Sequence, residues 1–173
     1  MSKAYFQSCT PSQMSREKFV SNFGDIYEHS AWVAEQAYDL GIDSSHNEID
    51  RLQQRMANIL LQADKQAQLD LINAHPDLAG KAAVAGELTE SSTSEQAGAG
   101  ISDCTSEEFA RFTELNDAYK AKFKFPFIMA VKGSNRHLIL AAFEDRIHNS
   151  PEQEFACALQ EINKIARFRL EIM

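Results

Sequence analysis

The strongest constraint on the fold is a run of apolar side chains at steps of three and four residues. Between residues 49 and 60 they fall on one helical face, with charged and amide residues between them. Only 7 glycines and 4 prolines occur in 173 residues, and the frequent Leu, Ala, Glu, Gln and Lys favour helix over strand. We therefore expect an all-α protein, folded as a single-domain helical bundle over residues 1–173. The apolar run is Ile49, Leu52, Met56, Ile59 and Leu60.

Start and stop signals predict further helices on both sides of this run. The strings Thr10-Pro11-Ser12-Gln13, Thr105-Ser106-Glu107-Glu108 and Ser150-Pro151-Glu152-Gln153 have the form of capping boxes. Helices are expected near residues 15–23, 30–40, 63–74, 105–123, 135–149 and 150 to the C-terminal region. Two stretches break the pattern, 75–100 and 124–135, and we expect both to be irregular.

Composition excludes several classes of function. The formal net charge of -8 argues against nucleic-acid binding, which needs a basic surface. No apolar run approaches the roughly 20 residues of a spanning helix, so we expect no membrane association. Cys9, Cys104 and Cys157 are far apart and match no metal-ligand spacing, so neither a metal site nor a disulfide framework is expected. Without a signal-peptide core, the chain is expected to be cytoplasmic.

The best candidate for chemistry is the string His75-Pro76-Asp77-Leu78-Ala79-Gly80. Proline after histidine keeps His75 out of the helical region and removes a backbone donor. A titratable ring on such a stiff turn, with carboxylates at Asp77 and Glu95, suits proton transfer. The alternatives are a histidine that only hydrogen-bonds at a helix end, or a metal cluster of His75, Asp77 and Glu95. The spacing of these three residues matches no recognised metal pattern.

Two readings are open for Glu95. The string Ser92-Thr93-Ser94-Glu95 fits a capping box, in which Glu95 bonds back to the Ser92 backbone. A short helix beginning at Ser92 would also offer unpaired N–H groups to an anion or carbonyl, with Glu95 and Gln96 beside the ligand. An acidic substrate would need an arginine, for which Arg146, Arg167 and Arg169 are the late candidates.

Five segments occur in a distinctive order: His75-Pro76-Asp77-Leu78-Ala79, Ser94-Glu95-Gln96-Ala97-Gly98, Leu115-Asn116 with Tyr119, residues 122–128, and Glu161-Ile162 to Arg169-Leu170. Together they resemble the OHCU decarboxylase family, and the resemblance covers nearly the whole chain. OHCU is 2-oxo-4-hydroxy-4-carboxy-5-ureidoimidazoline, an intermediate of uric acid breakdown. Lys124 stands where the family's KFGFPF pattern has glycine, and Asp103-Cys104 where many relatives have an apolar residue.

The resemblance implies an all-α enzyme that needs no cofactor, is usually a homodimer and converts OHCU to (S)-allantoin. His75 matches the family's catalytic proton donor, and Glu95, also catalytic, matches a polar substrate contact together with Gln96. Arg169 matches the arginine near the end of the last helix. The remaining implied substrate contacts, largely through backbone groups, are Pro76, Ser92, Thr93, Ser94, Phe127, Ile128, Met129, Ala130 and Val131.

The implied chemistry suits these residue types. The substrate carboxylate lies next to a C=N bond that can accept the electrons released with CO₂, so no metal or pyridoxal sink is required. A single fixed imidazole can then protonate one face of the ureido-bearing carbon, with Glu95 orienting His75 or the substrate hydroxyl. The apolar residues 125–128 can supply a dry surround for the departing carboxylate.

Two other readings of the sequence are retained. One is a helical interaction module without chemistry, in which His75-Pro76 is only a rigid turn. The other is a metal-dependent hydrolase that uses His75, Asp77 and Glu95.

Overall fold

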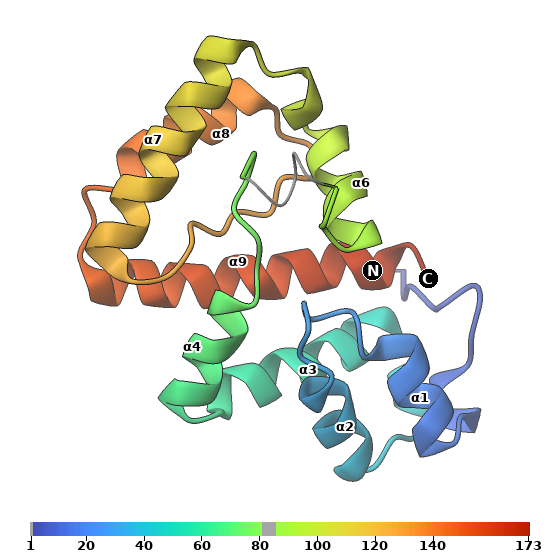
Figure 1. Cartoon of the computed structure of the whole chain (residues 1–173). Coiled ribbons are helices and arrows are strands. Elements are labelled where there is room, and N and C mark those ends of the chain that lie inside the picture. The colour runs from blue at the N-terminus through green and yellow to red at the C-terminus, as the bar shows by residue number, and fades with distance from the viewer. Residues whose placement is uncertain (1, 81–85) are drawn as a thin grey trace. The chain divides into compact units, whose positions relative to one another are not determined.

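The computed structural model describes residues 2–80 and 86–173. The chain divides into two compact units, whose residues can be followed by colour in Figure 1. The N-terminal unit is Met1–Ala74 with Asn163–Met173, and the central unit is His75–Ile162. The last helix, α9 (Pro151–Glu171), contributes residues to both. This division does not test the single-domain prediction, which stays a prediction.

The N-terminal unit is built around α3, whose apolar face the sequence predicted correctly. Leu52, Met56 and Leu60 are fully buried, and Ile49 and Ile59 nearly so. Each such side chain contributes about 1.5–3 kcal/mol through its removal from water. Helix α3 packs on α2, which packs on α1. The helices are α1 (Arg16–Phe23), α2 (Trp32–Asp39), α3 (Ile49–Gln62) and α4 (Lys65–Asn73), with the 3-10 turns η1 (Pro11–Gln13) and η2 (Ser44–Asn47).

The helix starts in this unit follow side-chain caps, with one correction. Ser15 Oγ accepts the Lys18 N–H at 3.2 Å, so α1 begins where the helix near residues 15–23 was predicted. The capping box predicted at Thr10 is wrong, because the Thr10 side chain makes no cap bond. Pro11 instead starts the short turn η1, where its fixed φ suits the first helical position.

The central unit contains α6 (Glu90–Gly98), the 3-10 turn η3 (Ile101–Asp103), α7 (Ser106–Phe123), α8 (Arg136–Arg146) and the first part of α9. The predicted capping box at Thr105 is confirmed, because Thr105 and Glu108 exchange side-chain to backbone bonds of 3.1 Å each. Ser150 and Gln153 form the same box at the start of α9. Helices α7 and α8 lie side by side (Figure 1).

The two stretches expected to be irregular differ in outcome. Stretch 75–100 contains α6, so the prediction is wrong for residues 90–98, and residues 81–85 lie outside the described part. Local composition misled because the Ser and Thr residues lower helix propensity, while burial of one face of α6 compensates. Stretch 124–135 is non-helical as predicted, and it starts at Lys124 with a left-handed φ of 67°.

The all-α prediction is confirmed. Within the described residues, the extended backbone pairs only at an isolated bridge between Tyr5 and Glu48. None of the helices in the described residues is both long enough and apolar enough to cross a bilayer.

Candidate functional site

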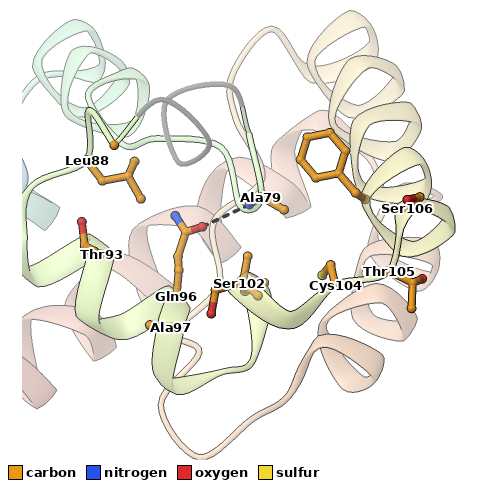
Figure 2. A pocket seen from close by; sticks show the side chains of 12 residues that line it. Ala79, Leu88, Thr93, Gln96, Ala97, Ser102, Cys104, Thr105 and Ser106 are labelled. Carbon is orange, nitrogen blue, oxygen red and sulfur yellow. Dashed lines mark hydrogen bonds between the residues drawn. The ribbon is translucent and has the colours of Figure 1, made fainter.

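The residues after His75 and Pro76 form a turn that two helices hold from different directions. From α6, Gln96 Oε1 accepts the Ala79 N–H at 3.1 Å (Figure 2). Gln96 Nε2 donates to the Asp77 carbonyl at 3.4 Å. From α7, Asn116 Nδ2 donates to the Leu78 carbonyl at 2.9 Å. We call residues 77–79 the clamped turn.

A fourth contact fixes the Asp77 side chain of the clamped turn. Lys120 Nζ, one helical turn after Asn116 on α7, lies 2.5 Å from Asp77 Oδ2. The pair is partly exposed, so its electrostatic contribution to stability is small. Its geometric effect is to engage the Asp77 carboxylate, one of the two carboxylates that the sequence placed near the imidazole.

The clamped turn includes a strained residue and a close approach. Ala79 has a φ of 54°, in the left-handed region that a non-glycine residue enters at a cost of about 1–2 kcal/mol. Gly80 allows the chain to fold back, because a Cβ at this position would lie 2.6 Å from Asp77 Cβ. Such a conformation persists only where its surroundings determine it fully, which the contacts from Gln96 and Asn116 provide.

The side chains of the predicted catalytic pair both belong to the central unit. His75 is buried, at 9% exposure, and follows directly on the end of the preceding helix. Pro76 beside it is half-buried, as is Glu95 on α6. Glu95 immediately precedes Gln96, the residue that holds the clamped turn.

Helix α6 presents its predicted contact residues on different faces. Ser92 and Gln96 are buried, each 5% exposed, whereas Thr93 and Ser94 are exposed. This separation follows from helical geometry, since residues four apart share a face.

The helix cap on α6 differs from the one predicted. Thr89, not Ser92, is the N-cap, and its Oγ1 accepts the Ser92 N–H at 3.2 Å. The predicted capping box at Ser92 is therefore wrong. The Thr93 N–H bonds to the Thr89 carbonyl at 2.9 Å, so the anion-binding amides predicted after Ser92 are used inside the helix. The N–H groups of these residues are therefore not the unpaired donors that the sequence predicted.

A pocket of about 620 Å³ adjoins the clamped turn at Ala79 (Figure 2). Of the predicted contacts, Thr93 and Gln96 line it, but His75 and Glu95 are not among the described lining residues. Its walls are mainly apolar, with contributions from Leu88, Ile101 and Phe109. The pocket therefore lies beside the clamped turn, on the side of Ala79 and Gln96.

The second predicted contact stretch, residues 127–131, is anchored by stacking and by hydrogen bonds. The Phe127 ring stacks on Phe143 at 3.9 Å between centroids, with the Arg146 guanidinium 4.2 Å from the same ring. Arg146 Nη1 donates to the Ile128 carbonyl at 2.7 Å, and the Ala130 N–H reaches Glu161 at 3.4 Å. Phe127, Ile128 and Val131 are buried, and Met129 and Ala130 half-buried.

Arg146 is itself held in a buried polar cluster. Its Nε donates to Glu154 at 2.9 Å, and Glu154, fully buried, also accepts bonds from the Tyr119 hydroxyl at 2.6 Å and from Asn149 at 3.0 Å. Burial, and then the bond to Glu154, raises the pKa of Tyr119, which keeps this hydroxyl a neutral donor. Arg146 is therefore a support for residues 127–131.

The other two candidate arginines lie in the N-terminal unit. Arg169 is 5% exposed, and its Nη1 donates to Glu28 at 3.0 Å and to the Ile26 carbonyl at 3.3 Å. Arg167 pairs with Asp50 and Glu171 at the surface. Of the two, Arg169 is the buried one, and its hydrogen bonds fix the direction of its guanidinium.

The described residues contain no ligand set for the alternative metal site. Within residues 2–80 and 86–173, no group of three or more His, Cys, Asp and Glu side chains could hold a metal ion. His75, Asp77 and Glu95 accordingly do not form such a group.

Sequence reasoning missed the residues that support the site. Asn116, Lys120 and Glu154 were assigned no role, although they hold the clamped turn or the anchor of residues 127–131. One signal was present, because Asn116 falls on the apolar face of α7 among residues spaced three and four apart. A polar residue in such a row needs a partner, but the sequence does not say which one.

Comparison with known proteins identifies the family to which the chain is similar. A model of the family described as OHCU decarboxylase matches residues 12–171. A 2-oxo-4-hydroxy-4-carboxy-5-ureidoimidazoline decarboxylase of Halalkalicoccus jeotgali is 44% identical, with 92% of this chain and 87% of that protein covered.

Two solved structures share the fold. An (S)-allantoin synthase has a TM-score of 0.74 at 35% identity; the match covers 92% of this chain and 50% of that one, so this chain spans about half its length. An OHCU decarboxylase determined in the presence of (S)-allantoin has a TM-score of 0.69 at 23% identity, with 91% and 96% covered, and supports the fold. The chain therefore belongs to the OHCU decarboxylase family.

Proposed function

We propose that this protein decarboxylates OHCU to (S)-allantoin in uric acid breakdown. The observation that carries the proposal is the family match over residues 12–171. The rigid support of the turn that follows His75 adds to it, because proton transfer with stereochemical control needs a donor held in one position.

The reaction has two steps. The bond between the hydroxyl-bearing carbon and its carboxylate breaks, and CO₂ leaves. The electron pair of that bond forms a double bond to the ureido-bearing carbon, while the π electrons of the C=N bond move to nitrogen, which takes up a proton. The hydroxyl then gives up its proton and becomes the ring carbonyl as the ureido-bearing carbon accepts a proton, and the face that receives this proton decides the enantiomer. The chain must therefore hold the substrate in one orientation and offer the proton from one side.

His75 is proposed as the proton donor. Its imidazole is buried and lies two residues before the clamped turn. Pro76 adds a fixed φ between the ring and the turn, which limits the motion of His75. Glu95 is proposed to orient His75 or the substrate hydroxyl.

Gln96 has two tasks under this proposal. Its carboxamide already bonds to Ala79 and Asp77, so it can contact the substrate only through the second Nε2 hydrogen and the second Oε1 lone pair. We therefore propose that Gln96 acts chiefly by holding the clamped turn. Ser92 and residues 127–131 are proposed to line the substrate, the latter through backbone groups other than the engaged Ile128 carbonyl and Ala130 N–H.

Arg169 is proposed to bind the substrate through directed hydrogen bonds. Because its guanidinium is paired with the buried Glu28, its charge is compensated within the protein. Its contribution is then the fixed direction of its donors. Pro76, Thr93 and Ser94 remain proposed contacts from the family resemblance, although Thr93 and Ser94 are exposed.

We also propose a homodimer in the cytoplasm, without metal, cofactor or nucleic acid. Light scattering coupled to size-exclusion chromatography measures the assembly directly, and a monomer at enzymatic working concentration contradicts the dimer. Turnover that is insensitive to chelators contradicts the metal-dependent hydrolase, the second candidate from the sequence.

The test of function uses freshly generated OHCU, because this compound decays without an enzyme. Unaided decay protonates either face and gives both enantiomers, so it produces no net circular dichroism from allantoin. The protein is expected to give a growing signal of one sign at a rate above the unaided decay. The proposal is wrong if the folded protein neither accelerates the loss of OHCU nor produces an enantiomeric excess.

A further inference from the structure

We propose that Asn116 is a positioning residue that fixes the catalytic histidine through the Leu78 carbonyl. The inference rests on the proposed function of His75 and deepens it. Asn116 lies on α7, 38 residues along the chain from the carbonyl that it holds, and its Nδ2 donates to that oxygen at 2.9 Å.

Asn116 is a polar side chain in the protein interior. The side chain is only 3% exposed and stands in the buried row of α7 with Leu115 and Tyr119. Its Oδ1 is also buried and has no hydrogen-bond partner among the described residues. A buried acceptor without a partner lowers the stability of the fold.

If only packing volume mattered, an apolar side chain at position 116 would stabilise the fold more than asparagine does. Leucine has a similar size and would leave no unsatisfied amide oxygen, although it would also leave the Leu78 carbonyl without its donor. Asparagine keeps that donor at the cost of an unpaired oxygen. The bond to Leu78 is thus what this residue type contributes at this position.

Leu78 lies close along the chain to His75, the proposed proton donor. Two residues, Pro76 and Asp77, separate it from His75, and the proline ring removes one of the dihedral freedoms between them. Gln96 fixes Asp77 and Ala79 from α6, and Asn116 fixes Leu78 from α7. The Gln96 bond to the Asp77 carbonyl is long, at 3.4 Å, whereas the Asn116 bond to the Leu78 carbonyl is 2.9 Å. Without Asn116, the Leu78 segment can therefore move and shift Asp77 and His75 with it.

The experiment compares Asn116→Leu and Asn116→Ser with a control on the same helix. The first variant fills the volume without a donor, and the second keeps a polar group too short to reach the Leu78 carbonyl. The control is Phe112→Leu, one turn earlier on α7 at a fully buried position without a bond to the clamped turn. All three are expected to lose stability in urea, so loss of stability alone does not separate them.

Turnover of fresh OHCU provides the first readout. Both Asn116 variants are expected to lower kcat by about ten- to a hundred-fold, the effect of a displacement of about 1 Å at a reacting group, with KM nearly unchanged. Their allantoin is expected to have a lower enantiomeric excess, because more of the protonation comes from solvent. Phe112→Leu is expected to keep both values within about twofold.

A second readout does not depend on turnover. In protein labelled at its histidines, the imidazole resonances of His75, assigned by loss in His75→Asn, are expected to shift or broaden in the Asn116 variants and to remain in place in Phe112→Leu. If wild-type protein fails to turn over OHCU, the proposed function fails, while this spectrum still tests the positioning.

The inference is overturned if a folded Asn116 variant keeps wild-type kcat and enantiomeric excess, or if its His75 resonances do not change. It is also overturned if neither Asn116 variant folds, because Asn116 is then required for the fold as a whole and not for the placement of one ring.

Discussion

The Gln96 carboxamide binds both ends of the clamped turn, with the Ala79 N–H 3.1 Å from Oε1 and the Asp77 carbonyl 3.4 Å from Nε2. One buried side chain on α6 therefore satisfies a donor and an acceptor of a segment that cannot form helix or sheet bonds. It also stabilises the left-handed conformation of Ala79. The residue adjoining the proposed catalytic Glu95 is thus part of the framework for His75.

Replacement of Gln96 by leucine is expected to destabilise the protein by about 1–3 kcal/mol, because the Ala79 N–H and the Asp77 carbonyl lose their partner in a buried place. Turnover is expected to fall as well, since the turn loosens. Urea unfolding and the allantoin assay measure the two effects. Ser91→Ala, an exposed change on the same helix, is the control and is expected to stay within about 0.5 kcal/mol. Unchanged stability in Gln96→Leu would contradict the clamp.

Thr89 and Glu95 are expected to separate helix capping from catalysis. Thr89→Ala removes the cap of α6 and should cost about 1 kcal/mol of stability, with turnover retained in the folded fraction. Glu95→Gln should cost less stability than Thr89→Ala and lower kcat clearly. The reverse pattern, with stability lost in Glu95→Gln at normal turnover, would return Glu95 to a structural role.

Lys124→Gly is expected to stabilise the protein. Lys124 ends α7 with a φ of 67°, which glycine adopts without steric cost. The gain from relieving about 1–2 kcal/mol of strain is partly cancelled by the greater freedom of glycine in the unfolded chain, so we expect a net gain of about 0.5–1 kcal/mol. Ala118→Gly, an exposed position in the interior of the same helix, is expected to lose about 1 kcal/mol. A loss of stability in Lys124→Gly would show that the lysine side chain contributes more than its strain costs.

The capping box of α7 is expected to weaken in acid. The Thr105 N–H that donates to Glu108, together with Arg136, holds the pKa of Glu108 below its ordinary value of 4.5. Because the folded state binds this proton less readily than the unfolded chain, the contribution of Glu108 is fully present above pH 4.5 and is lost as the pH falls through the lower folded-state pKa.

The variant Glu108→Gln tests the predicted direction of this pH dependence. Urea unfolding between neutral pH and about pH 3 should show a shallower loss of stability than in the wild type, since one of the groups that titrates on unfolding has been removed. Glu107→Gln, an exposed neighbour in the same helical turn, is expected to keep the wild-type slope. Equal slopes for wild type and Glu108→Gln would contradict the assignment.

Several features of this protein were determined by its sequence alone. The buried row from Ile49 to Leu60 and the capping box of Thr105 and Glu108 follow from neighbours within one or two helical turns, where spacing fixes which side chains meet. The family resemblance likewise rested on several strings in the right order, which together are far more specific than His75-Pro76-Asp77-Leu78 alone.

The tertiary structure decided the rest. The partners of the clamped turn lie 17, 38 and 43 residues away in the chain, at Gln96, Asn116 and Lys120. Spacing could not choose Thr89 over Ser92 as the cap of α6, because both carry a suitable hydroxyl. These outcomes depend on which helix faces the turn and which polar groups become buried there, and burial is a property of the packed chain and not of a local string.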